Sequence, residues 1–102
     1  MMIVLGRYKE IYNSDSLPCL RDDIGRPNEH KELILDYMKR IESTSASPAK
    51  IRDVITGQEI DLPLECKNDG VYGWRTDYMF YIEKYDLRIP DDFVKYVLSK
   101  TA

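Results

Sequence analysis

The chain has 102 residues, of which 43% are hydrophobic, 32% charged and 11% aromatic. These values are typical of a globular domain rather than a disordered chain, and the length predicts a single domain over residues 1–102. The net charge of −3 makes nucleic acid an unfavourable direct partner, because binding to phosphates needs an excess of basic groups.

The two ends of the chain and its cysteines bear on where the protein resides. The apolar run at residues 1–5 is too short for a secretory signal, and no segment has the roughly 18–20 apolar residues of a membrane span. Cys19 and Cys66 lack the close spacing of a metal-binding pair, and two cysteines do not make a disulfide framework. We therefore expect a cytoplasmic protein with reduced thiols, without a metal site and without contact with a membrane.

In chain order, the first predicted elements are a short strand at residues 2–5 and a helix over about 28–42. Apolar residues recur through the second segment at the i, i+3, i+4 spacing of an amphipathic helix. Asn28 is a favourable N-cap, and Lys39 and Arg40 lie where cations interact well with the C-terminal end of a helix.

Two hairpins are predicted after a serine-rich linker at residues 43–47. The first covers about 51–62, where apolar and acidic residues alternate with the period of a strand, and Pro63 is expected either to end its second strand or to mark an edge of the sheet. The second covers about 64–74, with its turn at Asn68-Asp69-Gly70.

Two more helices complete the prediction, at about 77–85 and 91–99. Tyr78, Tyr81 and Tyr85 fall on one face of the first, which favours packing of their rings with the hydroxyls reaching the surface. The predicted fold class is α+β, with a small antiparallel sheet packed against about three helices.

No catalytic constellation is evident. His30 is the single histidine, so the sequence has no pair of histidines, and a nucleophilic Cys19–His30 pair is a minor alternative. The acidic pair Glu59 and Asp61 is expected on the solvent face of a strand, where neither carboxyl is desolvated for acid–base work. We therefore predict no enzymatic activity, no catalytic residues and no cofactor.

Charge is unevenly distributed along the chain. Residues 53–92 contain ten acidic and four basic side chains, a net charge of −6, which leaves +3 on the rest. One interpretation is an ordinary solvated surface with a chance imbalance. The other is an acidic face that attracts a basic protein.

Tyr72 and Trp74 lie two residues apart on a predicted strand, so their side chains share one face. If that face is inward they belong to the core, as large aromatic residues usually do. If it is outward they are good anchors for an interface.

Several stretches carry a resemblance to a known family. They are Gly6–Tyr12, Ile24–Pro27, Ala46–Pro48, Arg52–Gly57, Asp69–Trp74 and, the strongest, Tyr81–Phe93. Together they resemble small bacterial immunity proteins of polymorphic-toxin systems, of the contact-dependent growth inhibition type. The chain departs from that pattern in Arg75-Thr76 and in the serine-rich linker.

The resemblance implies a protein that binds and neutralises the toxic C-terminal domain of a cognate effector, a basic nuclease in our interpretation, by covering its active site or an adjacent exosite. It implies no cofactor. From the charge pattern we expect the partner-binding residues to be Glu59, Asp61, Glu65, Asp69, Tyr72 and Trp74. Two alternatives stay open: an adaptor that binds a host protein without catalysis, and a small hydrolase that uses Cys19 or paired carboxylates.

Overall fold

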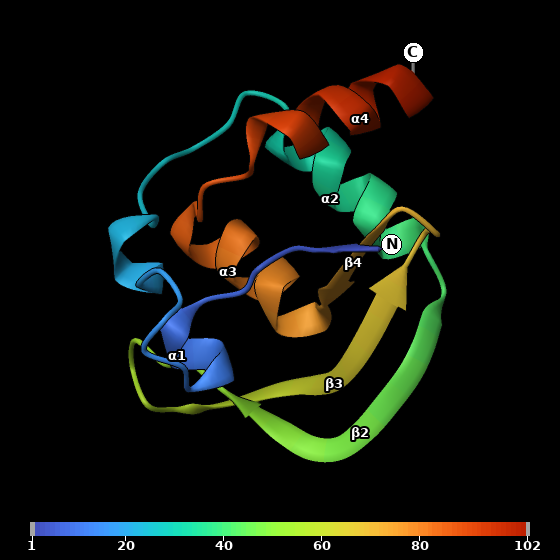
Figure 1. Cartoon of the computed structure of the whole chain (residues 1–102). Helices are drawn as coiled ribbons and strands as arrows, with labels where there is room; N and C mark the ends of the chain where they lie inside the picture. The colour runs from blue at the N-terminus through green and yellow to red at the C-terminus, as the bar shows by residue number, and fades with distance from the viewer. Residues whose placement is uncertain (1, 102) are drawn as a thin grey trace.

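In the computed structural model, which describes residues 2–101, helices and strands combine in an α+β fold (Figure 1). The elements are β1 (Ile3–Val4), α1 (Lys9–Tyr12), η1 (Leu20–Asp22), α2 (Lys31–Arg40), β2 (Ser43–Arg52), β3 (Glu59–Asn68), β4 (Tyr72–Arg75), α3 (Thr76–Tyr85) and α4 (Asp91–Thr101). The fold class predicted from the sequence is confirmed.

The strands form one sheet in the order β1-β4-β3-β2. The pairs β2–β3 and β3–β4 are antiparallel, but β1 lies parallel to β4, so the sheet is mixed rather than purely antiparallel as predicted. The difference arises because the N-terminal segment returns to the free edge of β4. There the amide of Ile3 donates to the carbonyl of Val71 at 2.8 Å, and the amide of Leu5 donates to that of Gly73 at 2.7 Å.

The first hairpin is longer than predicted. The serine-rich linker is part of β2, and β3 continues through Pro63, so of the two alternatives for Pro63 the strand end is wrong and the edge position agrees with the pairing. β4 pairs only with residues 66–68 of β3, so at Pro63 the strand has a neighbour on one side only, Lys50 of β2. Proline, which lacks an amide hydrogen to donate, is tolerated there because the other side is unpaired and the register beside it is already irregular. The second hairpin forms at the predicted turn, but its paired part is limited to residues 66–68 of β3 and 73–75 of β4, with Lys67 opposite Trp74.

The three main helices are confirmed with small changes at their ends. Asn28 is not the N-cap of α2 as predicted: it accepts a hydrogen bond from the amide of His30, which holds residues 28–30 as a turn, and the helix begins at Lys31. α2 ends at Arg40 rather than at 42, because the backbone of Ile41 is extended. α3 begins one residue earlier than predicted, and α4 extends two residues further. The short helices α1 and η1 were not predicted.

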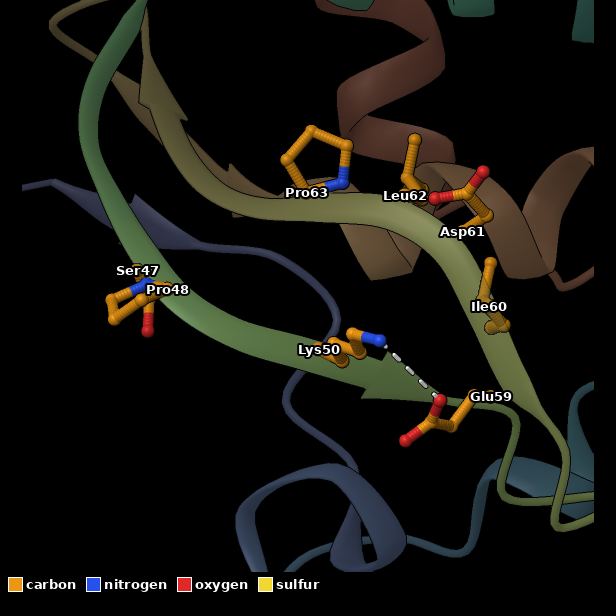
Figure 2. Close-up of a pocket in the computed structure, with 8 residues that line it drawn as sticks. All are labelled: Ser47, Pro48, Lys50, Glu59, Ile60, Asp61, Leu62 and Pro63. Atoms are coloured by element: carbon orange, nitrogen blue, oxygen red, sulfur yellow. Dashed lines mark ion pairs between the residues drawn. The ribbon is translucent and has the colours of Figure 1, made fainter.

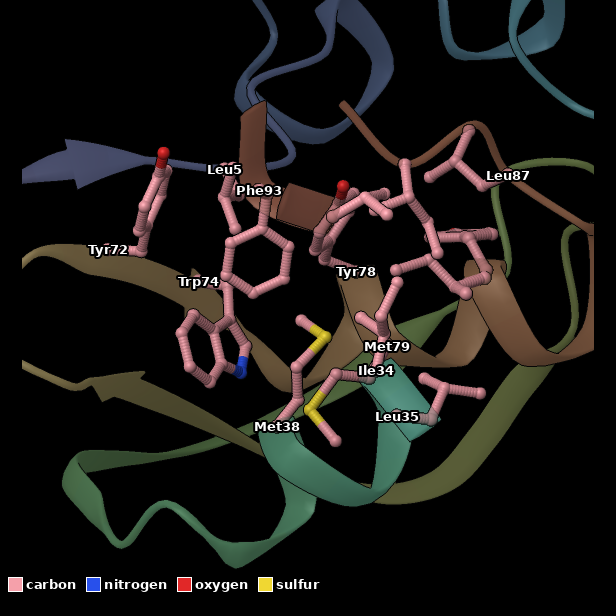
Figure 3. Close-up of a cluster of buried hydrophobic side chains, with 14 of the residues drawn as sticks. Leu5, Ile34, Leu35, Met38, Tyr72, Trp74, Tyr78, Met79, Leu87 and Phe93 are labelled. Carbon is pink, nitrogen blue, oxygen red and sulfur yellow. The ribbon is translucent and has the colours of Figure 1, made fainter. Parts of the chain in front are cut away.

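The main core lies where α2, α3 and α4 meet β4 (Figure 3). Its centre includes fully buried Met38, Tyr81 and Phe93. The ring of Phe93 contacts those of Tyr72 and Trp74, with centroids 4.9 and 5.9 Å away. Aromatic contacts of this kind stabilise a core beyond the area that they bury. Within residues 2–101, no helix has the length and apolar character needed to cross a membrane.

Candidate functional site

The β2–β3 hairpin is tied to α3 at its far end. The loop at residues 53–58 is organised by Asp53, whose Oδ1 accepts hydrogen bonds from the amides of Ile55 and Thr56 at 2.8 and 3.4 Å. The hydroxyl of Tyr85 on α3 donates to the other carboxylate oxygen of Asp53 at 2.5 Å. Tyr81 adds a second tie, because its hydroxyl accepts from the amide of Val54.

A second attachment lies near the start of α3. The hydroxyl of Thr76 donates to the carbonyl of Pro63 at 2.8 Å and accepts from the amide of Glu65 at 3.1 Å. Between the two attachments the hairpin curves beneath the helices (Figure 1).

Two adjoining hollows follow this curved part of the hairpin. One, of about 430 Å³, lies between β3 and the helices α2 and α3, and the other, of about 520 Å³, lies along the hairpin itself (Figure 2). Ile60, Asp61 and Leu62 line both hollows, and we call the combined feature the hairpin groove. Half-buried Leu62 and Phe80 give it an apolar floor.

Three carboxylates at the groove have polar partners. Glu59 pairs with Lys50 at 3.7 Å, Glu83 pairs with Lys39 at 3.5 Å, and Glu65 accepts a hydrogen bond from a serine hydroxyl at 2.9 Å. The amine of a lysine on β3, Lys67, is directed to the last carbonyls of α2.

Asp61 differs from these carboxylates. Its side chain is exposed, and within residues 2–101 it makes no hydrogen bond or ion pair. Figure 2 shows it apart from the Lys50–Glu59 pair, beside Leu62. The groove therefore presents a free carboxylate next to an apolar floor, an arrangement suited to a basic and partly apolar segment of another protein.

Asp69 was predicted to contact a partner, but it is half-buried and its carboxylate is engaged by groups of the same chain. Its Oδ2 accepts hydrogen bonds from the hydroxyls of Tyr37 at 2.5 Å and Tyr96 at 2.8 Å, and its Oδ1 accepts from the amides of Val71 and Tyr72. Desolvation acts to raise the pKa of Asp69, but these hydrogen bonds outweigh it and lower the pKa to about 2. Asp69 therefore joins the turn to α2 and α4.

Tyr72 and Trp74 belong to the core, which was one of the two alternatives for this pair. Their exposed fractions are 8% and 2%. They are inside because the face of β4 that carries them is covered by α4, whose Phe93 contacts both rings. As long as the chain keeps this fold, neither ring is available as an interface anchor.

Comparison of the chain with family models, with curated proteins and with solved structures finds no match. The resemblance to immunity proteins stays a prediction from the sequence.

Part of the acidic excess of the chain is covered by the fold, because two acidic side chains are buried and five are half-buried. Seven of the 18 acidic side chains are buried or half-buried, against three of the 15 basic ones, which leaves eleven acidic and twelve basic side chains exposed. Of the ten acidic residues in 53–92, five are exposed: Glu59, Asp61, Glu83, Asp91 and Asp92. Asp53, Asp69 and Asp77 are used for internal contacts. Because exposed acidic and basic side chains are nearly equal in number, the surface as a whole would not attract a basic partner. Any such attraction would come from the carboxylates at the groove.

Cys19 and His30, the alternative catalytic pair, each contact a different side chain. The thiol of Cys19 donates to Glu10 at 3.2 Å, and the same carboxylate accepts from the amide of Leu20, which fixes the turn that leads into η1. The imidazole of His30 lies 3.4 Å from the carboxylate of Glu29. No cluster of three or more potential metal ligands is found in residues 2–101.

The sequence pattern identified only part of the groove. Glu59, Asp61 and Glu65 line it together because all three lie on β3. The period-two alternation predicted a strand only at Glu59 and Asp61, whereas Glu65 was assigned to the second hairpin. The contributions of the helices, Phe80, Glu83 and Lys39, were missed. Phe80 carried a signal, since it is an aromatic residue outside the Tyr78-Tyr81-Tyr85 stripe and so lies off the buried face of α3.

Proposed function

We propose that the chain is a non-enzymatic immunity protein, which binds the toxic domain of a cognate effector through the hairpin groove and thereby blocks the toxin. The single observation that supports this surface is the exposed, unpartnered carboxylate of Asp61 beside the apolar floor of the groove. The class of partner comes from the sequence resemblance.

Such a groove suits a basic nuclease for a physical reason. A nuclease that holds phosphates needs cationic side chains at its active site, and a carboxylate placed among them competes for the same positions. Charges at a rim mainly accelerate association and select the partner, whereas buried apolar contacts supply most of the affinity. In this proposal Asp61 and Glu59 steer the toxin, and Leu62 and Phe80 hold it.

The first test is a growth assay. The C-terminal portion of the protein encoded immediately upstream is expressed with and without this chain. The proposal expects the fragment to stop growth and the chain to restore it. A harmless fragment, or one that kills regardless of the chain, would remove the immunity function and favour a search for a host partner by pull-down.

The second test maps the contact surface. Asp61→Lys combined with Glu59→Lys is expected to slow association and to weaken binding of the toxic domain by about tenfold or more. The matched control combines Asp36→Lys with Glu42→Lys, two exposed acidic positions that do not line the groove. Asp69 is left unchanged, because its loss would disturb the turn that it holds.

Equal affinities for the two double variants would exclude the groove as the contact surface. Rescue in the growth assay by the wild-type chain would still support neutralisation in that case, so the two parts of the proposal fail separately.

A further inference from the structure

A third hollow, of about 370 Å³, lies away from the hairpin between the N-terminal segment and the start of α4. We call it the N-terminal pocket. Buried Leu5 and Phe93 form part of its apolar lining, and Gly6 brings the backbone close to the ring of Tyr78. No residue that lines the hairpin groove also lines the N-terminal pocket.

Two tyrosine hydroxyls at this pocket lack protein partners. The hydroxyl of Tyr78 is completely buried and has no hydrogen-bond partner within residues 2–101, and that of Tyr72 makes no hydrogen bond there either. In Figure 3 both hydroxyls point to the side of the core where Leu5 lies. By contrast, the hydroxyl of Tyr8 at the same pocket donates to Asp23 at 2.8 Å. A buried hydroxyl without a partner is costly, so a ligand that bonds to Tyr78 gains from a group already desolvated.

The charged side chains of the pocket are of both signs. Arg7 and Arg88 line it together with Asp23 and Asp92, and none of the four forms an ion pair with a protein group in the described part of the chain. Opposite charges that line one hollow without pairing leave positions for a ligand that itself carries both signs. Arg88 and Asp23 are the two charges near enough to affect Tyr78, whose pKa is raised chiefly by burial. The phenol is therefore a protonated donor.

We propose that the N-terminal pocket binds a free apolar α-amino acid. Its carboxylate would be held by the guanidinium of Arg88 and the hydroxyl of Tyr78, its ammonium group by Asp23 and Asp92, and its side chain by the apolar lining. A simple anion would meet the unneutralised carboxylates, and a neutral apolar molecule would leave the hydroxyl of Tyr78 without a partner. This site is independent of the proposed neutralisation of a toxin.

The test uses three probes that share a phenyl ring and differ in charge. L-phenylalanine carries both charges, 3-phenylpropanoate only the negative one and 2-phenylethylammonium only the positive one. Each is titrated into the ¹⁵N-labelled full chain, up to about 10 mM, while the amide resonances are followed by NMR. The expected result is saturable shifts at Leu5, Gly6 and Phe93 with L-phenylalanine, and affinities about tenfold lower for the two analogues.

Variants locate the ligand within the pocket. Tyr78→Phe keeps the ring and removes an unpaired hydroxyl, so it is expected to fold normally and to bind L-phenylalanine about tenfold more weakly. Arg88→Gln is expected to have a similar effect, whereas Arg40→Gln, an exposed change on α2 outside the pocket, is expected to have none.

Two results would overturn the proposal. One is the absence of saturable shifts at the pocket with L-phenylalanine. The other is binding of 3-phenylpropanoate or 2-phenylethylammonium as tight as that of L-phenylalanine, since the ligand would then not need both charges. Both results come from the wild-type chain and do not depend on the folding of any variant.

Discussion

The contact between Gly6 and Tyr78 can be tested by adding a single methyl group. Gly6 has a φ of +72°, and a Cβ at this position would lie 2.6 Å from Cδ1 and 2.7 Å from Cγ of Tyr78. These atoms are at the base of the aromatic ring, and Tyr78 is 4% exposed, so the ring cannot move aside without a shift of α3. Gly6→Ala therefore combines backbone strain with a collision inside the core.

Gly25 is a matched control, because its φ of +71° is nearly the same but its Cβ would meet nothing within 4 Å. The left-handed backbone disfavours alanine by about 1–2 kcal/mol, partly offset by a stiffer unfolded chain. Gly25→Ala should then lower the free energy of unfolding by about 1 kcal/mol. Overpacking adds about 1–3 kcal/mol, so Gly6→Ala should lower it by about 2–4 kcal/mol.

Urea denaturation of both variants, followed by circular dichroism, measures the two values under the same conditions. The difference between them isolates the collision with Tyr78 from the backbone strain that both positions share. Equal losses of stability would show that the ring yields to the methyl group, and our reasoning on the rigidity of this part of the core would be wrong.

Three further changes test the internal carboxylates and the groove. Asp69→Asn should reduce the free energy of unfolding by about 1–3 kcal/mol. The pKa of Asp69 is about 2 in the folded protein, below its ordinary value of 3.8. The ionised carboxylate should therefore stabilise the fold above about pH 4, and this contribution should be lost as the pH falls toward 2. The free energy of unfolding, measured as a function of pH, should show this loss for the wild type and not for the variant. Tyr85→Phe should release Asp53 and accelerate hydrogen exchange at the amide of Ile55, a result that unchanged exchange would contradict. Asp61→Lys should change the melting temperature little, since a surface substitution without lost partners costs within about 0.5 kcal/mol; a large decrease would mean that Asp61 has a structural partner.

The helices were predictable because each carries a local signal. Apolar residues at helical spacing, acidic residues such as Asp91 and Asp92 at the start and Lys39 at an end mark these segments without reference to the rest of the chain. The start of β2 carries no such signal. Its small polar residues become a strand because β3 lies beside them and supplies the backbone partners, as in the pairing of Ser45 with Cys66.

In the candidate site, too, features with a local sequence signal were predicted and features that depend on distant residues were not. The alternation that placed Glu59 and Asp61 on a strand is local, and it led to the groove. The role of Asp69 depends on Tyr37 and Tyr96, which are 32 and 27 residues away in the chain. The Asn-Asp-Gly signal identified the turn but not the two hydroxyls that the turn brings to the carboxylate. A count of charges along the sequence therefore overestimated the acidity of the surface.

The irregular course of β2 has a consequence for how copies of the chain behave at high concentration. β2 is an edge of the sheet, and an exposed edge strand offers its backbone as a template to a neighbouring molecule. Here Pro48 has no amide hydrogen to give, and irregularities in register interrupt the strand between Ser47 and Ile51. The opposite edge, β1, is only two residues long. Neither edge presents a long regular row of donors and acceptors, so the protein can leave its hairpin open to solvent with little tendency to polymerise through strand addition.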